Sequence, residues 1–350
     1  MNRMKKAVLS ASVSFFFTLA CAAAPVLAAD LVVVSFGGNN KDAQTKAFYE
    51  PYQKTTGVKL VAGEYSGELA KIKAMVDTRS VNWDVVEVGS SELARGCEEG
   101  LFEQIDPAKI GEGKDLIDGA VQPCGAGIFV WSTVLAYDGD RLKKGPTSWK
   151  DFWDVKKFPG KRAMHKGALY SLEIALLADG VDRKEVYKTL GTSAGVDRAF
   201  KKLDQLKPHI QWWEAGAQPA QYLVAGDVVM STAYNGRIAN AQKEGKNLKI
   251  VWDGNIYDFD YWAIPRGSRN VAEAQKFIAF ASRPENQKVF SETIAYGPAS
   301  KKALTLVSKK PLGELPNAPQ NNAHAVVVDT RFWTEYGESL EQRFNAWAAR

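Results

Sequence analysis

Three charged side chains follow apolar runs in one short part of the chain. Arg237 comes after the run Val228–Ala233. Asp258 and Asp260 come after the run Leu248–Trp252. In open α/β sheets, the turns at strand ends carry ligand contacts. We therefore expect a polar-aromatic turn after each run, with a cation on one and anions on the other. Such a pair of turns suits a small ligand with a charge at each end; the alternative is a surface salt bridge beside core aromatics.

Aromatic residues flank both of these turns. Tyr234 stands three positions before Arg237, and the motif YDFDYW interleaves its two acids with aromatic rings that include Tyr261 and Trp262. Rings at these positions could wall a ligand site or fill a core. The elements that position the charged residues must decide between these two interpretations.

The part of the chain that begins near residue 31 has a β-α-β-α-β-α pattern. Its three predicted strands are Leu31–Phe36, Val58–Val61 and Trp83–Val88, two of them continuous apolar runs of the kind that is buried on both faces of a sheet. Helical crossovers between strands indicate a parallel sheet.

The carboxyl ends of these strands place Gly38, Ser66 and Ser90 along one crevice, which makes them candidate ligand contacts. Ser66 is also predicted to cap the helix that follows it. The sequence GGNNKD lacks the spacing of a dinucleotide or phosphate loop, so its glycines are expected to allow close approach to the backbone.

The middle of the chain has a different character and predicts a second domain. The run Ile128–Tyr137 is predicted to leave the first domain as a strand, and the chain returns near residues 260–268. This crossing pattern predicts a two-lobed α/β clamshell, each lobe a mixed sheet flanked by helices, with a hinge of crossing strands. Trp131, Tyr261 and Trp262 would lie near that hinge. The predicted parts are a leader (1–28), lobe 1 (29–133 and 265–310), lobe 2 (134–264) and a docking tail (311–350).

The tail is predicted to end in a helix near Thr330–Trp347. One face of that helix carries Phe332, Tyr336, Leu340, Phe344 and Trp347, which we expect to be buried against a domain surface.

The first residues predict export through a cleavable signal peptide. A basic start, MNRMKK, precedes an apolar run that ends in Pro25 and small residues, with cleavage expected after Ala28 or one residue later. An uncleaved anchor and lipidation of Cys21 are the alternatives. Without the leader, the net charge falls from +5 to about +2, which gives no argument for binding nucleic acid or a membrane surface.

The remaining cysteines, Cys97 and Cys124, are expected to form one disulfide in an oxidising compartment. A bridge that closes a loop of this length stabilises by about 3–4 kcal/mol in the chain-entropy model. Two separate buried thiols are the alternative.

Several segments together resemble the periplasmic solute-binding proteins of ABC importers, in the branch with the spermidine and putrescine receptors. They include WDVVEV, PTSWKDFWDVKKFPGKRA, AGDVVMSTAYNGR, YWAIPRGSRNVAEAQKFIAFASRPENQ and AYGPASKKA, and they span most of residues 31–303. The resemblance implies two α/β lobes that close on a solute, delivery of the solute to a membrane permease, a monomeric protein and no catalytic activity.

The resemblance also assigns site residues. Asp260 matches an acid that pairs with a ligand amine in polyamine receptors, and Tyr234 matches an aromatic of the site. Arg237 stands where a putrescine receptor has an acid, and Tyr170 also replaces an acid. Because an arginine opposes a diamine but binds a carboxylate in bidentate fashion, the sequence favours a γ-aminobutyrate-like ω-amino acid. A polyamine is the alternative if Arg237 points out of the cleft.

Other classes have less support. The sequence contains no G-x-S-x-G or H-E-x-x-H motif, and its histidines, His165, His209 and His324, are far apart. The sequence also lacks the adjacent pair of tyrosines that iron-binding receptors often use. We therefore expect no enzyme, metal or cofactor.

Overall fold

The computed structural model describes residues 30–110 and 115–350, so the predicted leader lies outside the described residues. The strands are β1 (Leu31–Ser35), β2 (Leu60–Glu64), β3 (Val85–Gly89), β4 (Val121–Gln122), β5 (Gly125–Asp138), β6 (Arg162–His165), β7 (Ile210–Trp213), β8 (Met230–Tyr234), β9 (Leu248–Ala263), β10 (Gly297–Pro298) and β11 (Val326–Val327).

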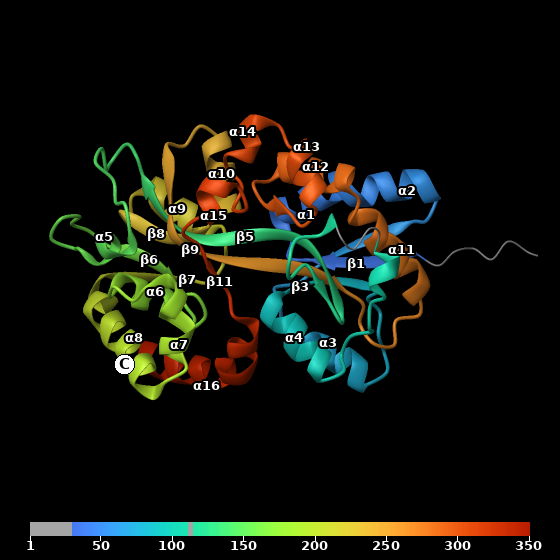
Figure 1. Ribbon diagram of the computed structural model, residues 1–350, viewed down its shortest axis with the longest axis horizontal. Coiled ribbons are helices and arrows are strands. Elements are labelled where there is room, and N and C mark those ends of the chain that lie inside the picture. Colours follow the sequence, from blue (N-terminus) through green and yellow to red (C-terminus); the bar gives the residue numbers. More distant parts are fainter. Residues whose placement is uncertain (1–29, 111–114) are drawn as a thin grey trace, which may run out of the picture.

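These strands form one mixed sheet in the order β2-β1-β3-β9-β5-β8-β6-β7. The strands β2, β1 and β3 are parallel to one another, as are β8, β6 and β7. The two long strands β5 and β9 are antiparallel and run through the middle (Figure 1). We call the half around β1–β3 lobe 1 and the half around β6–β8 lobe 2. The predicted α/β architecture with a hinge of crossing strands is confirmed. The lobe boundaries remain predictions, because the sheet is continuous through both lobes.

Helices cover both faces of the sheet (Figure 1). In lobe 1, α1, α2, α11, α12 and α13 lie on one side and α3 and α4 on the other; in lobe 2, α9 and α10 lie opposite α5–α8 and α16. The helices are α1 (Gly38–Gln44), α2 (Glu50–Thr56), α3 (Leu69–Asp77), α4 (Ser90–Glu98), α5 (Trp149–Trp153), α6 (Ser171–Ala178), α7 (Val186–Leu190), α8 (Ser193–Leu206), α9 (Gln218–Ala225), α10 (Asn235–Lys243), α11 (Val271–Ala281), α12 (Pro284–Thr293), α13 (Lys301–Leu306), α14 (Lys309–Leu312), α15 (Pro319–Asn322) and α16 (Thr330–Ala348).

The strand β9 corrects one expectation. We expected a turn after Trp252, but the strand continues without a break to Ala263. The reason is visible in YDFDYW, whose aromatic and acidic residues alternate with the period of a strand. The buried aromatic rings stabilise the extended backbone, and the two acids share the opposite face.

The C-terminal helix α16 packs on lobe 2, where Trp347 and Phe344 contact Trp212. One residue of the predicted face is wrong: Tyr336 is 40 % exposed, and Trp333 is buried in its place. Neither α16 nor any other helix within residues 30–110 and 115–350 is long and apolar enough to cross a lipid bilayer.

Candidate functional site

Two carboxyl groups face the centre of the molecule from β9. Asp258 and Asp260 are two residues apart, so both point to the same side of the strand, and both are buried. Trp131 Nε1 donates a hydrogen bond to Asp260 Oδ1 at 2.9 Å, and the Tyr170 hydroxyl donates to Asp258 Oδ2 at 3.1 Å. These bonds hold both acids in place where β5, β9 and lobe 2 meet.

Burial disfavours the ionised forms of both acids and so raises their pKa values. The pKa of Asp258 is raised to about 7, mainly by burial and also by the nearby charge of Glu92, whereas the Ser90 hydroxyl and hydrogen bonds from the Phe259 N–H and the Tyr170 hydroxyl act to lower it. The Ser90 hydroxyl makes no hydrogen bond of normal geometry, although it lies close to Asp258. The pKa of Asp260 is well above the ordinary range, first because of burial and then because of the adjacent Glu87. A cation placed here would favour the ionised forms.

Glu87, on β3, lies beside Asp260 and is a buried acid of this region that was not among the predicted site residues. It is fully buried, and its carboxyl group accepts hydrogen bonds from Asn40 Nδ2 at 2.8 Å, Gln44 Nε2 at 3.0 Å and Phe36 N at 3.0 Å. Burial raises its pKa as well. An acid inside the apolar run WDVVEV was the signal that could have identified it, because an acid in a buried strand needs partners.

Arg237 approaches the same region from the first turn of α10. A Cβ atom at Gly38 would lie 3.2 Å from Arg237 Nη1, so the guanidinium reaches the backbone of lobe 1. Gly38 has φ +56°, a conformation that disfavours any side chain there. Arg237 Nε is buried and has no hydrogen-bond partner among the described residues. The guanidinium therefore keeps donors available for an anion.

Two tyrosines lie near both Arg237 and Asp260. Burial raises the pKa of Tyr296 to about 12, and Arg237 and Asp260 act on it in opposite directions, the former lowering it and the latter raising it. Burial also raises the pKa of Tyr234, on which the same two charges act with the same signs. Both tyrosines therefore lie within electrostatic reach of Arg237 and of Asp260.

Aromatic rings close the remaining sides. Trp131 makes edge contacts with Tyr170 and Tyr234, with ring centroids 5.5 Å and 4.9 Å apart, and Trp213 meets Tyr234 at 5.2 Å. Rings in this arrangement exclude water, which strengthens any charge pair formed inside.

The backbone of Tyr170 is strained, with φ +69°, just before α6 begins. Helix α16 supports this turn from outside: Glu341 Oε1 accepts hydrogen bonds from Ala168 N at 2.8 Å and Leu169 N at 3.2 Å. Strain of this kind persists only where its surroundings impose it, and it is concentrated at ligand sites. No pattern in the sequence identifies Glu341 as a site residue, because it is 171 positions beyond Tyr170 in the chain.

The structure brings most of the predicted site residues together: Arg237, Asp258, Asp260, Tyr234, Trp131, Tyr170, Ser90 and Gly38. It leaves three outside. Trp262 packs against Phe277 in the lobe 1 core, and Tyr261, on the opposite face of β9 from Asp260, donates to Gly119 O at 2.8 Å. Ser66 is exposed, and the prediction that it caps a helix is wrong, because α3 begins after Glu68.

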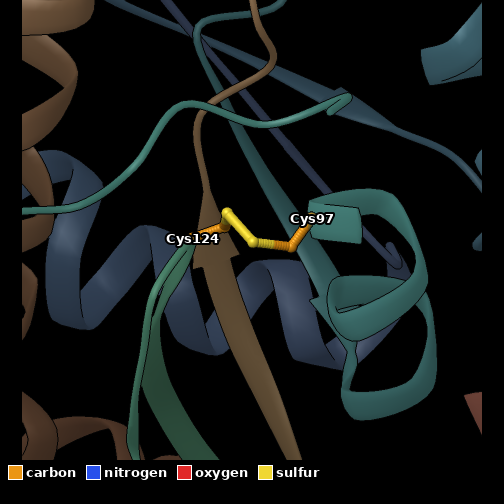
Figure 2. Close-up of a disulfide and its surroundings, with 2 residues drawn as sticks. All are labelled: Cys97 and Cys124. Atoms are coloured by element: carbon orange, nitrogen blue, oxygen red, sulfur yellow. A yellow bond between two sulfur atoms is a disulfide. The ribbon is translucent and has the colours of Figure 1, made fainter. Parts of the chain in front are cut away.

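The predicted disulfide is present between Cys97 and Cys124, whose Cα atoms lie 5.8 Å apart. It joins helix α4 to the start of β5 (Figure 2). Because α4 begins at Ser90 and β5 carries Trp131, the bridge ties together two elements that line the site.

The sequence and the fold are similar to those of known proteins. The family model for bacterial extracellular solute-binding proteins matches residues 47–320. A γ-aminobutyric acid-binding protein of Pseudomonas aeruginosa is 58 % identical over 337 residues, which cover 96 % of each chain. A spermidine/putrescine-binding periplasmic protein of Escherichia coli is 27 % identical over 282 residues, 74 % of this chain and 75 % of that protein.

Among solved structures, a GABA receptor superposes with a TM-score of 0.83 at 33 % identity, covering 92 % of this chain and 98 % of the receptor. The family match covers well over half of the sequence, and the two-lobed α/β fold agrees with it. The chain belongs to the family of bacterial extracellular solute-binding proteins.

Proposed function

We propose that this protein captures γ-aminobutyrate, or an ω-amino acid of similar length, between its two lobes. The observation that carries the proposal is the pairing of a guanidinium with free donors, Arg237, and a set of buried acids on β9 within one aromatic enclosure. A zwitterion supplies the missing partner at both ends. The similarity to the γ-aminobutyric acid-binding protein and to the solved GABA receptor supports the same ligand class.

The carboxylate of the ligand would bind Arg237. A guanidinium presents its donors in a planar fork that matches both oxygens of a carboxylate. Tyr234 and Tyr296 lie within electrostatic reach of Arg237 and could donate further hydrogen bonds. Gly38 leaves room for the guanidinium beside the backbone of lobe 1, so ligand binding would join the lobes there.

The ammonium of the ligand would bind Asp260, with Asp258 as its neighbour. Trp131 and Tyr170 already orient these carboxyl groups by hydrogen bonds, so little ordering is needed when the ligand arrives. Their raised pKa values mean that the empty site is electrostatically unfavourable for the ionised acids. The ammonium relieves this cost, which favours a cationic group at this end of the ligand.

A polyamine fits less well, because its second ammonium would face Arg237. The guanidinium lies next to Gly38 of lobe 1, which supports a position of Arg237 facing the other lobe. An uncompensated pair of cations in a desolvated site costs several kcal/mol. A polyamine therefore remains a second candidate only for a state in which Arg237 leaves the cleft.

The role in transport follows from the family. Extracellular solute-binding proteins collect a solute outside the cytoplasmic membrane, and this one is proposed to deliver it as a monomer to the permease of an ABC importer. We propose export by the cleavable leader of residues 1–28. Binding and release without chemical change of the solute is the expected behaviour.

The test is calorimetry and thermal shift on refolded, ligand-free protein with γ-aminobutyrate, β-alanine, putrescine and spermidine. A ligand at 100 times its Kd should add about 2.7 kcal/mol to the free energy of unfolding. Arg237→Ala should weaken γ-aminobutyrate binding by about 2–5 kcal/mol while sparing diamines, and Arg331→Ala, which removes an exposed arginine, serves as control. Unchanged γ-aminobutyrate affinity in Arg237→Ala would refute the assignment.

A further inference from the structure

A concave site lies at the far end of α10 from Arg237. Its cavity has a volume of about 510 Å³, within the range of small-molecule sites, and it is lined by Lys243, Lys246, Lys249 and Lys310 with a single acid, Glu314. None of these four lysines forms an ion pair with a described carboxylate. Like charges gathered around one concavity repel each other, and a bound anion would relieve this repulsion.

A buried hydroxyl also lines this cavity. Ser291, on α12, is only 2 % exposed, and its Oγ has no hydrogen-bond partner among the described residues. Buried polar groups are nearly always hydrogen-bonded, so an unpartnered hydroxyl in the wall of a cavity indicates a missing partner. An oxyanion would accept a hydrogen bond from Ser291 and from the lysine ammonium groups at once.

The lining comes from both sides of the hinge. Lys243, Lys246 and Lys249 belong to the end of α10 and the start of β9 in lobe 2, whereas Ser291 and Lys310 belong to α12 and α14. Helix α12 packs on lobe 1, where its Phe290 stacks on Phe48 and Phe129 (Figure 1).

One direct contact already crosses this site. Lys243 Nζ donates to the carbonyl oxygen of Thr293, at the end of α12, at 2.8 Å. An anion bound beside this contact would touch both lobes and would lose part of its contacts if they separated. A ligand of that kind stabilises the conformation in which the lobes meet.

We propose that this cavity binds a small multivalent oxyanion and that the bound anion favours the closed arrangement of the lobes. The anion is recognised by clustered ammonium groups and by the Ser291 hydroxyl. The first half of the proposal is independent of the solute, whereas the effect on solute affinity rests on the proposed function.

Calorimetry with inorganic phosphate, and separately with citrate, tests the first half at constant ionic strength in chloride and without γ-aminobutyrate. Both anions should bind, and the double variant Lys246→Gln/Lys310→Gln should weaken binding at least about tenfold. The double variant Lys54→Gln/Lys201→Gln removes the same charge from exposed lysines elsewhere and should bind like the wild type. No binding of either anion, or equal weakening in both double variants, overturns the site.

Ser291→Ala tests the hydroxyl without removing charge. It should weaken phosphate binding about fivefold and leave Tm unchanged, because the hydroxyl has no partner to lose within the protein. Unchanged phosphate affinity in this variant, with binding lost in Lys246→Gln/Lys310→Gln, would overturn the assignment of Ser291 as a ligand contact.

The coupling is measured by titrating γ-aminobutyrate with and without saturating phosphate at matched ionic strength. The Kd should fall about fivefold with phosphate, and γ-aminobutyrate should tighten phosphate binding by the same factor. Equal Kd values in a protein that binds both ligands overturn the effect on closure. Failure to bind γ-aminobutyrate in chloride would refute the proposed function instead, and the phosphate result would still stand.

Discussion

The affinity for γ-aminobutyrate should depend on pH because of Asp258. In the empty site, burial holds its pKa at about 7. An ammonium beside the carboxylate favours the ionised form, so the pKa falls on binding and the complex holds fewer protons than the free protein. The ionisation of Asp258 on binding therefore releases protons, and its contribution to the affinity is full above pH 7 and declines as the pH falls below it.

The magnitude follows from the size of this shift. If the pKa of Asp258 in the complex lies below about 5, each pH unit below 7 weakens binding about tenfold, or about 1.4 kcal/mol. Between pH 8 and pH 5 the Kd should rise about 100-fold. γ-Aminobutyrate keeps both charges throughout this range, because ordinary carboxyl and amine pKa values lie outside it. His165 does not interfere, since burial lowers its pKa to about 4.

The assay is calorimetry at half-unit steps from pH 5 to pH 8, in pairs of non-phosphate buffers with different heats of ionisation. The buffer dependence of the heat counts the protons released. Asp258→Asn keeps the shape and the acceptor for Tyr170 but cannot titrate, so it should remove the part of the pH dependence that Asp258 contributes. Glu92→Gln, which removes the charge of an acid close to Asp258, is the control variant. A Kd that changes less than about twofold across the range in the wild type would refute the electrostatic reasoning.

Three further predictions concern the scaffold. Glu173 is fully buried, and burial raises its pKa to about 7, so its ionisation opposes folding above that pH. In urea denaturation, Glu173→Gln should therefore add about 1–3 kcal/mol to the free energy of unfolding at pH 8 and little at pH 5. Equal effects at both pH values would contradict this prediction. Glu341→Ala should weaken γ-aminobutyrate binding about tenfold by releasing the turn before Tyr170, with Glu338→Ala on the same helix as control. In a Tyr170→Phe background, the effect of Glu341→Ala should largely disappear. If the effects of the two substitutions on the binding free energy simply add, Glu341 does not act through Tyr170. Cys97→Ser should lower the free energy of unfolding by about 3–4 kcal/mol, and an unchanged Tm would show that the bridge is not a stabilising one.

Parts of the fold could be predicted because the physics was local. Apolar runs such as Leu31–Ser35 and the core of Val85–Gly89 can only be buried within a sheet, and they form parallel strands of lobe 1. The long run around Ile128 identified the crossing strand β5 for the same reason. The disulfide between the two cysteines could also be predicted from residue type, and so could the choice of positions 237, 258 and 260 as candidate ligand contacts.

The features that the sequence did not reveal depend on contacts between distant parts of the chain. Glu87 meets Asp260 only because β3 and β9 are neighbours in the sheet. Glu341 supports the turn before Tyr170 only because α16 docks on lobe 2. The strand β9 is a different case, because YDFDYW has the period-two pattern of a strand although its acidic residues favour a turn. An acidic residue can stand in a buried strand when other groups of the protein pair with it, as Trp131 does with Asp260.

The charge of the site separates a zwitterion from a diamine more firmly than the identity of any one residue. Asp258, Asp260 and Glu87 all have raised pKa values, so the empty site holds fewer negative charges than its three carboxyl groups suggest. Arg237 adds a positive charge on the other side. A diamine would have to ionise the whole acid cluster and still face the guanidinium. A zwitterion brings no net charge. Its ammonium needs only one ionised carboxylate of the protein, and its own carboxylate neutralises Arg237. The proton release measured on binding reports how far the cluster must ionise, and thus tests this distinction directly.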